Sequence, residues 1–246
     1  MQIDLKTVKK TFAKSIEKYP QNAVVQKIMA HNLVEKIIAL APKPTSILEV
    51  GAGAGILSEQ LAKHIYFEKF YANDLTEKSE KFVKKYIPTS KFFAGDFRRI
   101  NFGAKFDLIA SNAVFQWFDN PEKILNKCYT MLNSNGILAF TTFNRENFYE
   151  LKNLTGLTLD YNNMEEWISL LEKQNFKVLY KNSFEHVLNF VNPLEILTHL
   201  KNTGVNSLAE KPLSVTEVKK LCDNYRQTYP ELTLTYKPIV FIAQKL

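Results

Sequence analysis

The stretch that decides the fold is Ser46-Ile-Leu-Glu-Val-Gly-Ala-Gly-Ala-Gly-Ile-Leu-Ser58. Its apolar run over residues 47–50 predicts a short strand covered on both faces, and residues 54–64 predict a helix. Glycines at positions 51, 53 and 55 lie at the junction, where a residue without a Cβ permits a tight turn and close approach of a ligand to the backbone. We therefore expect a ligand across the end of a buried strand, although a glycine-rich turn without a ligand would have the same pattern.

The glycine spacing restricts the class of ligand. Dinucleotide-binding turns typically follow G-x-G-x-x-G and place a pyrophosphate at a helix N-terminus. Here the spacing is G-x-G-x-G, and Glu49 stands just before the turn, where its carboxylate would repel a diphosphate and attract an ammonium group. The pattern therefore favours an adenosine cofactor that is not a dinucleotide.

Polar residues follow several other predicted strands. These strands cover residues 67–72, 90–93, 106–110 and 136–143, the last after a helix at 121–132 and a turn at 133–136. Asp74 comes about 20 residues after the glycine turn, where a carboxylate accepts hydrogen bonds from ribose hydroxyls. Capping of a helix at 76–86 is its alternative role. Since Ser111 and Asn112 also follow a strand, these strand ends should converge on one crevice.

The glycine turn and the acidic residues that follow it resemble motif I of the Rossmann-like, S-adenosylmethionine-dependent methyltransferases. The resemblance implies an α/β fold with a seven-stranded sheet flanked by helices. It also implies that, in Gly95-Asp96-Phe97, the carboxylate binds the adenine amino group and the phenyl ring lies beside adenine. The expected cofactor-binding residues are Glu49, Gly51, Ala52, Gly53, Gly55, Asp74, Leu75, Asp96, Phe97, Ser111 and Asn112.

Length and composition favour one domain. The chain has 246 residues and is 46% hydrophobic, which is enough for a substantial core. We expect a helical cover over 1–43, with a helix capped by Asn22, and a cofactor-binding half over 44–143. A loop at 144–161, a helix at 164–173 and a strand at 176–180 should follow. A helical lid at 193–230, inserted before a last strand at 232–243, would complete the domain.

Several classes of protein are disfavoured. No apolar run is long enough to cross a membrane, and the charged and polar residues 1–10 do not resemble a secretory leader. Cys128 and Cys222 are isolated and the four histidines are scattered, so we expect no metal site and a reducing, cytoplasmic location.

The net charge of +7 and the pI near 9.2 predict attraction to an acidic partner, with a clear excess of lysine over residues 1–43. A lysine-rich solvated surface without a partner is the alternative. Four of the basic residues are arginines and no basic block alternates with aromatic residues, so a nucleic-acid partner is not expected.

The segment over residues 107–117 bears on the acceptor of the reaction. Gln116 offers an amide N–H and Trp117 an indole N–H, and these neutral donors would hold a carboxylate without pairing it to a fixed positive charge. Packing of this segment against the sheet is the alternative.

A closer resemblance extends over nearly the whole chain. Residues 12–26, 111–117, 194–206 and 234–241 are similar to the malonyl-acyl-carrier-protein O-methyltransferases of biotin synthesis, and the segment around Gly204 is the most specific. Members often carry Cys-Gly-x-Gly where this chain has Gly51-Ala52-Gly53, a departure that leaves the turn chemistry intact.

This resemblance implies methylation of the free carboxylate of a malonyl thioester on an acidic acyl carrier protein. Tyr19, Gln116 and Trp117 would form the catalytic pocket, although Tyr19 is equally suited to anchoring the lid. The expected carrier contacts are Lys201, Lys211, Lys219, Lys220 and Arg226. Malonyl-coenzyme A, another small acid or a quinone precursor as acceptor, and a non-catalytic cofactor-binding protein, remain alternatives.

Overall fold

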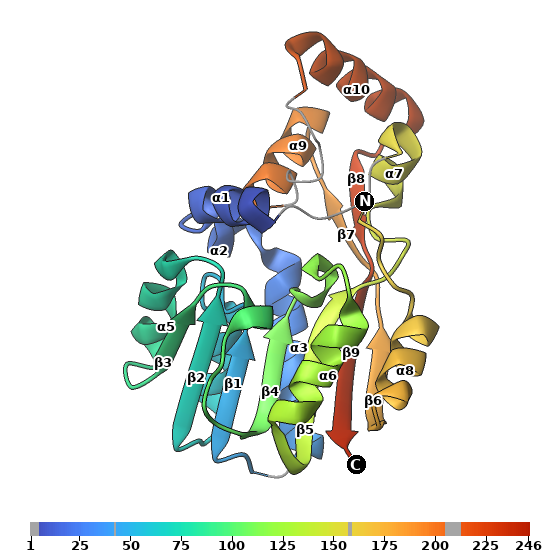
Figure 1. Cartoon of the computed structure of the whole chain (residues 1–246). Helices are drawn as coiled ribbons and strands as arrows, with labels where there is room; N and C mark the ends of the chain where they lie inside the picture. The colour runs from blue at the N-terminus through green and yellow to red at the C-terminus, as the bar shows by residue number, and fades with distance from the viewer. Residues whose placement is uncertain (1–4, 42, 157–158, 205–212) are drawn as a thin grey trace.

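The protein, described by a computed structural model over residues 5–41, 43–156, 159–204 and 213–246, is built on one central sheet. Seven strands follow the order β3-β2-β1-β4-β5-β9-β6, and β9 is antiparallel to both of its neighbours (Figure 1). The strands are β1 (Ser46–Val50), β2 (Lys69–Asp74), β3 (Lys91–Ala94), β4 (Phe106–Asn112), β5 (Leu132–Phe143), β6 (Phe176–Ser183) and β9 (Pro238–Lys245). The expected seven-stranded α/β sheet is therefore confirmed.

Helices cover both faces of this sheet because successive strand residues point to opposite sides. Leu48 packs in a cluster with α6 (Pro121–Met131) and α8 (Met164–Lys173). Its neighbour Ile47 packs in a second cluster with the helices of the other face. Those helices are α3 (Val24–Leu40), α4 (Ile56–His64) and α5 (Glu80–Tyr86). Single 3-10 turns are η1 (Glu77–Ser79), η2 (Phe97–Arg99) and η3 (Phe115–Trp117).

A covering layer lies beyond the carboxyl ends of β1, β2 and β4 (Figure 1). Its members are α1 (Leu5–Ser15), α2 (Tyr19–Asn22), α7 (Tyr149–Thr155), α9 (Pro193–Asn202), α10 (Val215–Thr228) and a small antiparallel sheet of β7 (His186–Asn189) and β8 (Thr233–Tyr236). A third apolar cluster, which includes Met29, Ile196 and Leu234, joins this layer to α3. The carboxyl ends of these strands therefore face the covering layer rather than open solvent.

The single last strand expected over 232–243 is wrong. The chain changes sheets at Lys237, whose backbone N–H donates to the side chain of Asn147 instead of to a neighbouring strand. Residues before this point form β8, and β9 begins at Pro238 in the central sheet. Lys237 and Pro238 stand at this break, between the alternating residues 232–236 and the apolar residues 239–243, so the sequence carries a signal that the prediction of a single strand did not use.

Two further local predictions need correction. Asn22 ends α2 and donates to the carbonyl of Lys18, so the cap of α3 is Ala23. The expected loop over 144–161 contains α7, and residues 133–136 belong to β5. Helix α8, by contrast, has the predicted bounds, because Asn163 and Glu166 form a capping box at its start.

Within the described residues, none of the helices has the length and apolar character needed to cross a membrane.

Candidate active site

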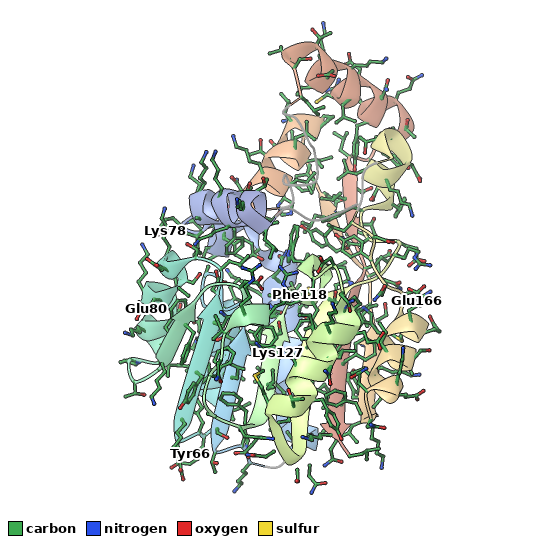
Figure 2. All side chains as sticks on the ribbon, in the orientation of Figure 1. Tyr66, Lys78, Glu80, Phe118, Lys127 and Glu166 are labelled. Atoms are coloured by element: carbon green, nitrogen blue, oxygen red, sulfur yellow. The ribbon has the colours of Figure 1, made fainter. Side chains whose placement is uncertain are left out.

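A cavity lies between the strand ends and the covering layer, and it contains about 1260 Å³ of unfilled space. Phe118, labelled in Figure 2, forms part of its wall. Lys78, also labelled there, lies in η1 after β2 and donates to the carbonyl of Ala13 at 3.1 Å, which connects α1 to η1 (Figure 2). The predicted site residues on the wall are Tyr19, Glu49, Gly51, Ala52, Gly53, Asp74, Leu75, Phe97, Asn112, Gln116 and Trp117. The cavity therefore brings together residues from both halves of the prediction.

The glycine turn after β1 forms the floor of the cavity. Gly51 has a φ of +71°, and a Cβ there would come within 2.3 Å of the side chain of Val114. Gly55 also has a positive φ, but a Cβ there would meet the carbonyl of Phe82 at 2.9 Å. Gly55 is absent from the cavity wall, so its glycine serves the packing of α4 against α5.

Glu49 is a buried carboxylic acid on the cavity wall, 1% exposed. Burial raises its pKa to about 8, against the hydrogen bond from Ser58 and with a smaller contribution from Asp74. Because a cation beside this carboxylate would restore its charged form, the position suits an ammonium group of a ligand.

Asp74 lies at the end of β2 and connects the glycine turn to the next loop. Its Oδ2 accepts from the backbone N–H of Gly53 and its Oδ1 from that of Thr76, both at 2.9 Å. Burial raises the pKa of Asp74, and these two bonds oppose the rise. The following η1 turn is capped by Thr76, so Asp74 does not have the capping role that was its alternative.

Asp96 and Phe97 lie in different surroundings. Phe97 is buried on the cavity wall, whereas Asp96 is not among the lining residues. Partial burial alone would raise the pKa of Asp96, but hydrogen bonds from Arg98 outweigh it and lower the pKa. Because both carboxylate oxygens accept from Arg98, the expected contact with an adenine amino group has no direct support in this geometry.

Ser111 and Asn112 at the end of β4 make internal hydrogen bonds. Ser111, fully buried, donates to the carbonyl of Val50 at 2.8 Å and holds β4 to β1, away from the wall. Asn112 lines the cavity, yet its amide donates to the carbonyl of Gln26 at 3.0 Å and accepts from Thr141. Both residues therefore support the site through hydrogen bonds within the protein.

The segment after β4 divides between packing and lining. Phe115 packs on Phe140 with ring centroids 4.6 Å apart, while Gln116 and Trp117 line the cavity. The amide of Gln116 donates to the carbonyl of Ala113 at 2.8 Å, which leaves one N–H for a ligand. Ala113 itself has a φ of 56°, a conformation that turns the chain under the cavity.

Tyr19 reaches the cavity from α2 and packs edge-on against Phe12, with ring centroids 5.0 Å apart. Burial, with a smaller contribution from Asp74, raises the pKa of Tyr19, so its hydroxyl is a neutral donor. Sequence reasoning did not assign Gln26, Phe148, Tyr161 or Tyr236, which also line the cavity. The resemblance of residues 12–26 and 234–241 to a known family was the only signal for Gln26 and Tyr236, and Phe148 and Tyr161 had none.

The wall has two parts of different charge. The part named here the cofactor half comprises Glu49, Gly51, Gly53, Asp74 and Phe97, which the sequence resemblance assigned to a cofactor. The part named here the acceptor half comprises Tyr19, Gln26, Gln116, Trp117, Tyr161 and Tyr236, and includes the three residues that the resemblance assigned to the acceptor. Among the lining residues that the structure describes, Lys9 is the only Lys or Arg. The described residues contain no group of three or more metal-ligating side chains.

Of the basic residues expected to contact a carrier, those that the structure describes lie on the covering layer, away from the wall. Lys201 lies in the last turn of α9, and Lys219 and Lys220 lie on α10, all exposed to solvent. Arg226 forms an ion pair with Asp223 at 3.7 Å, and position 211 is outside the described residues.

Comparison with known proteins gives the family. Residues 48–140 match a methyltransferase domain family. A malonyl-acyl-carrier-protein O-methyltransferase from Haemophilus influenzae is 32% identical over 98% of this chain and 95% of its own length. One from Calditerrivibrio nitroreducens is 34% identical over 97% and 96%. The chain belongs to the malonyl-acyl-carrier-protein O-methyltransferase family.

Solved structures support the fold of this family. The YcgJ protein from Bacillus subtilis has a TM-score of 0.62 at 14% identity and covers 87% of this chain and 98% of its own. The N-methyltransferase NodS from Bradyrhizobium japonicum, in complex with S-adenosyl-L-homocysteine, has a TM-score of 0.53 at 13% identity over 87% and 85%. At such identities the likeness shows a shared fold.

Proposed function

We propose that this methyltransferase transfers the methyl group of S-adenosylmethionine to the free carboxylate of a malonyl thioester on acyl carrier protein. The observation that carries the proposal is the divided cavity of a chain that matches malonyl-acyl-carrier-protein O-methyltransferases over nearly its whole length. Its cofactor half offers buried carboxylates to a cationic donor, and its acceptor half offers neutral hydrogen-bond donors to an anion.

The methyl donor is S-adenosylmethionine, which supplies an electrophilic methyl group on a sulfonium. The residues present fit it: Glu49 is buried without an ion-pair partner among the described residues, and the glycines of the turn add no side chain of their own to the floor. Glu49 would hold the ammonium group, Asp74 the ribose hydroxyls, and Phe97 the adenine ring.

Catalysis of this transfer needs no general base. A malonyl carboxylate is ionised at pH 7, so it is already a nucleophile. Two histidines lie beside Tyr236, His199 through a hydrogen bond and His186 as its cross-strand neighbour, and neither lines the cavity. Tyr19, Gln116 and Trp117 would align one carboxylate oxygen with the methyl group, and such alignment contributes up to roughly 7–11 kcal/mol to lowering the barrier.

The carrier itself would be recognised by charge. The chain has a net charge of +7, and acidic carrier helices would bind Lys201, Lys211, Lys219, Lys220 and Arg226 in a salt-dependent manner. Methylation removes the charge of the malonyl unit, so that fatty-acid synthesis elongates it toward the pimeloyl ester of biotin synthesis in the cytoplasm.

The deciding experiment incubates the purified protein with S-adenosylmethionine and either malonyl carrier protein or malonyl-coenzyme A. Mass spectrometry should find one added methyl group on the carrier-bound malonyl unit, and faster transfer than to the coenzyme A thioester. Transfer to neither acceptor would contradict the proposed function. Equal rates with the two acceptors would show that the carrier protein is not recognised and would remove it from the proposed function.

A further inference from the structure

Three buried polar side chains, those of His199, Tyr236 and Gln26, form a line behind the acceptor half. His199 Nε2 lies 2.6 Å from the hydroxyl oxygen of Tyr236. Burial raises the pKa of that hydroxyl, while hydrogen bonding from Thr203 and Gln26 opposes the rise. Gln26 is 4% exposed, Tyr236 0% and His199 8%, and the first two line the cavity. These side chains link α3, β8 and α9 at one point.

One atom of this line has no partner among the residues that the structure describes. The Oε1 atom of Gln26 is buried and accepts no hydrogen bond from them, although a buried acceptor without a donor is costly. The backbone beside it is fixed, because Asn112 donates to the carbonyl of Gln26 and Asn112 is held in turn by Thr141. The main chain at Gln26 is therefore fixed beside the cavity, and a half-turn about the last side-chain torsion would exchange the positions of the amide oxygen and nitrogen.

A half-turn of this amide gives its oxygen a donor and leaves its nitrogen free for a ligand. Burial lowers the pKa of His199 to about 4, so its imidazole is neutral at pH 7 and carries one N–H. With that proton on Nε2, His199 donates to Tyr236, and Tyr236 donates to Oε1 of Gln26. The amide nitrogen of Gln26 then presents an N–H to the cavity.

We propose that Gln26 binds the acceptor carboxylate through its amide N–H, and that Tyr236 and His199 are positioning residues that fix the direction of this amide. The site suits a carboxylate because its neutral donors hydrogen-bond one carboxylate oxygen and leave the other oxygen nucleophilic. The inference rests on the proposed function, since it requires an acceptor with a free carboxylate.

The test compares variants along the line in the full-length enzyme with malonyl carrier protein as acceptor. Gln26→Leu and Tyr236→Phe should raise the KM for the acceptor about tenfold or more, because each removes or misdirects a hydrogen bond to a charged group. The Kd for S-adenosylmethionine, measured by calorimetry, should stay within about threefold of the original value. Thermal unfolding shows that each variant is folded.

Two substitutions at position 199 separate positioning from packing. His199→Gln keeps an N–H donor toward Tyr236 and should leave the acceptor KM near that of the original enzyme. His199→Phe removes the donor and should raise the acceptor KM as much as Tyr236→Phe does. Tyr225→Phe is the matched control, since Tyr225 is a buried tyrosine of the same apolar cluster whose hydroxyl donates to the carbonyl of Thr233. It should leave the acceptor KM unchanged.

An unchanged acceptor KM in Gln26→Leu would overturn the inference. So would an equal loss of cofactor affinity, because it would assign Gln26 to the ammonium group of the cofactor. If the original enzyme binds the cofactor but does not methylate malonyl carrier, the proposed function fails instead. Binding of malonyl-pantetheine in the presence of S-adenosylhomocysteine then decides the inference: a loss in Gln26→Leu supports it, and equal binding overturns it.

Discussion

The two halves of the cavity differ in charge while sharing one wall. The cofactor half holds two buried carboxylates, Glu49 and Asp74, on neighbouring strands. The acceptor half is lined by tyrosines, glutamines and a tryptophan. A cationic methyl donor is stabilised by nearby anions, whereas a cation beside the acceptor would weaken its nucleophilic oxygen. Charge on one side and neutral donors on the other therefore suit a transfer from a sulfonium to a carboxylate.

The largest effect should follow from placing charge in the acceptor half. Gln116→Glu puts a carboxylate beside the acceptor carboxylate and removes the remaining N–H. The value of kcat/KM should fall by about 100-fold or more, because like charges repel strongly in a water-poor cavity. Steady-state kinetics with malonyl carrier measures this. The Kd for the cofactor should change little, and a comparable loss there would show that the two halves are not separate.

A pH titration addresses the charge of the cofactor half. Glu49 has a pKa raised to about 8, so it is protonated in the free protein at pH 7 and must lose its proton to pair with the ammonium group. Cofactor affinity should rise up to about tenfold per pH unit between about pH 5.5 and about pH 7.5. Calorimetry in buffers of different ionisation enthalpy should detect the released proton. A Glu49→Gln variant with the same pH dependence would assign the proton to another group.

Asp74→Asn should weaken cofactor binding by about tenfold, because one acceptor for the ribose and for the backbone N–H groups of Gly53 and Thr76 is lost. The Kd from calorimetry measures this effect. Asp96→Asn provides the comparison: Asp96 is bound to Arg98 in this structure, so its loss should be smaller. A larger loss for Asp96→Asn would restore the adenine contact that the sequence resemblance implied.

The smallest effect concerns the stability of the cofactor-free protein. Between the ordinary pKa of Glu49, 4.5, and its folded value of about 8, the folded state binds more protons than the unfolded state. Stability should therefore fall as pH rises through this range. Glu49→Gln should flatten this decline and raise the melting temperature at pH 7.5 by a few degrees, as thermal scans would show. An unchanged decline would place its origin elsewhere.

Local patterns predicted most of the elements. Strand β1, helix α4 and helix α8 follow from runs of about ten residues or fewer, in which a continuous apolar run, helical spacing and capping act between neighbours. The last strand failed for the same reason. Residues 232–236 and 239–243 each have a strand pattern, and the Lys237-Pro238 step between them does not by itself distinguish a bend from a change of sheet. The contacts of Asn147 and Asn144 with Lys237 divide the two strands between two sheets.

The candidate site divides in a similar way. Glu49, Gly51 and Asp74 stand at strand ends, and parallel strands of known order carry their ends to one edge, so the sequence alone brought them together. Gln26, His199 and Tyr236 are separated by 37 residues or more, and nothing between neighbours relates them. Their meeting depends on how α3, α9 and β8 pack in the covering layer.

The sequence by itself determined the sheet, the glycine turn and the charge of the cofactor half, because these depend on local backbone geometry and strand order. The tertiary structure alone decided which polar groups are buried. It also decided which carboxylates have an oxygen that faces the cavity and which are paired within the protein, as Asp96 is with Arg98. Burial and hydrogen-bond partners come from residues far apart in the chain. For that reason the sequence indicated Tyr19, Gln116 and Trp117 in the acceptor half, whereas Gln26, Tyr161 and Tyr236 joined them only in the folded chain.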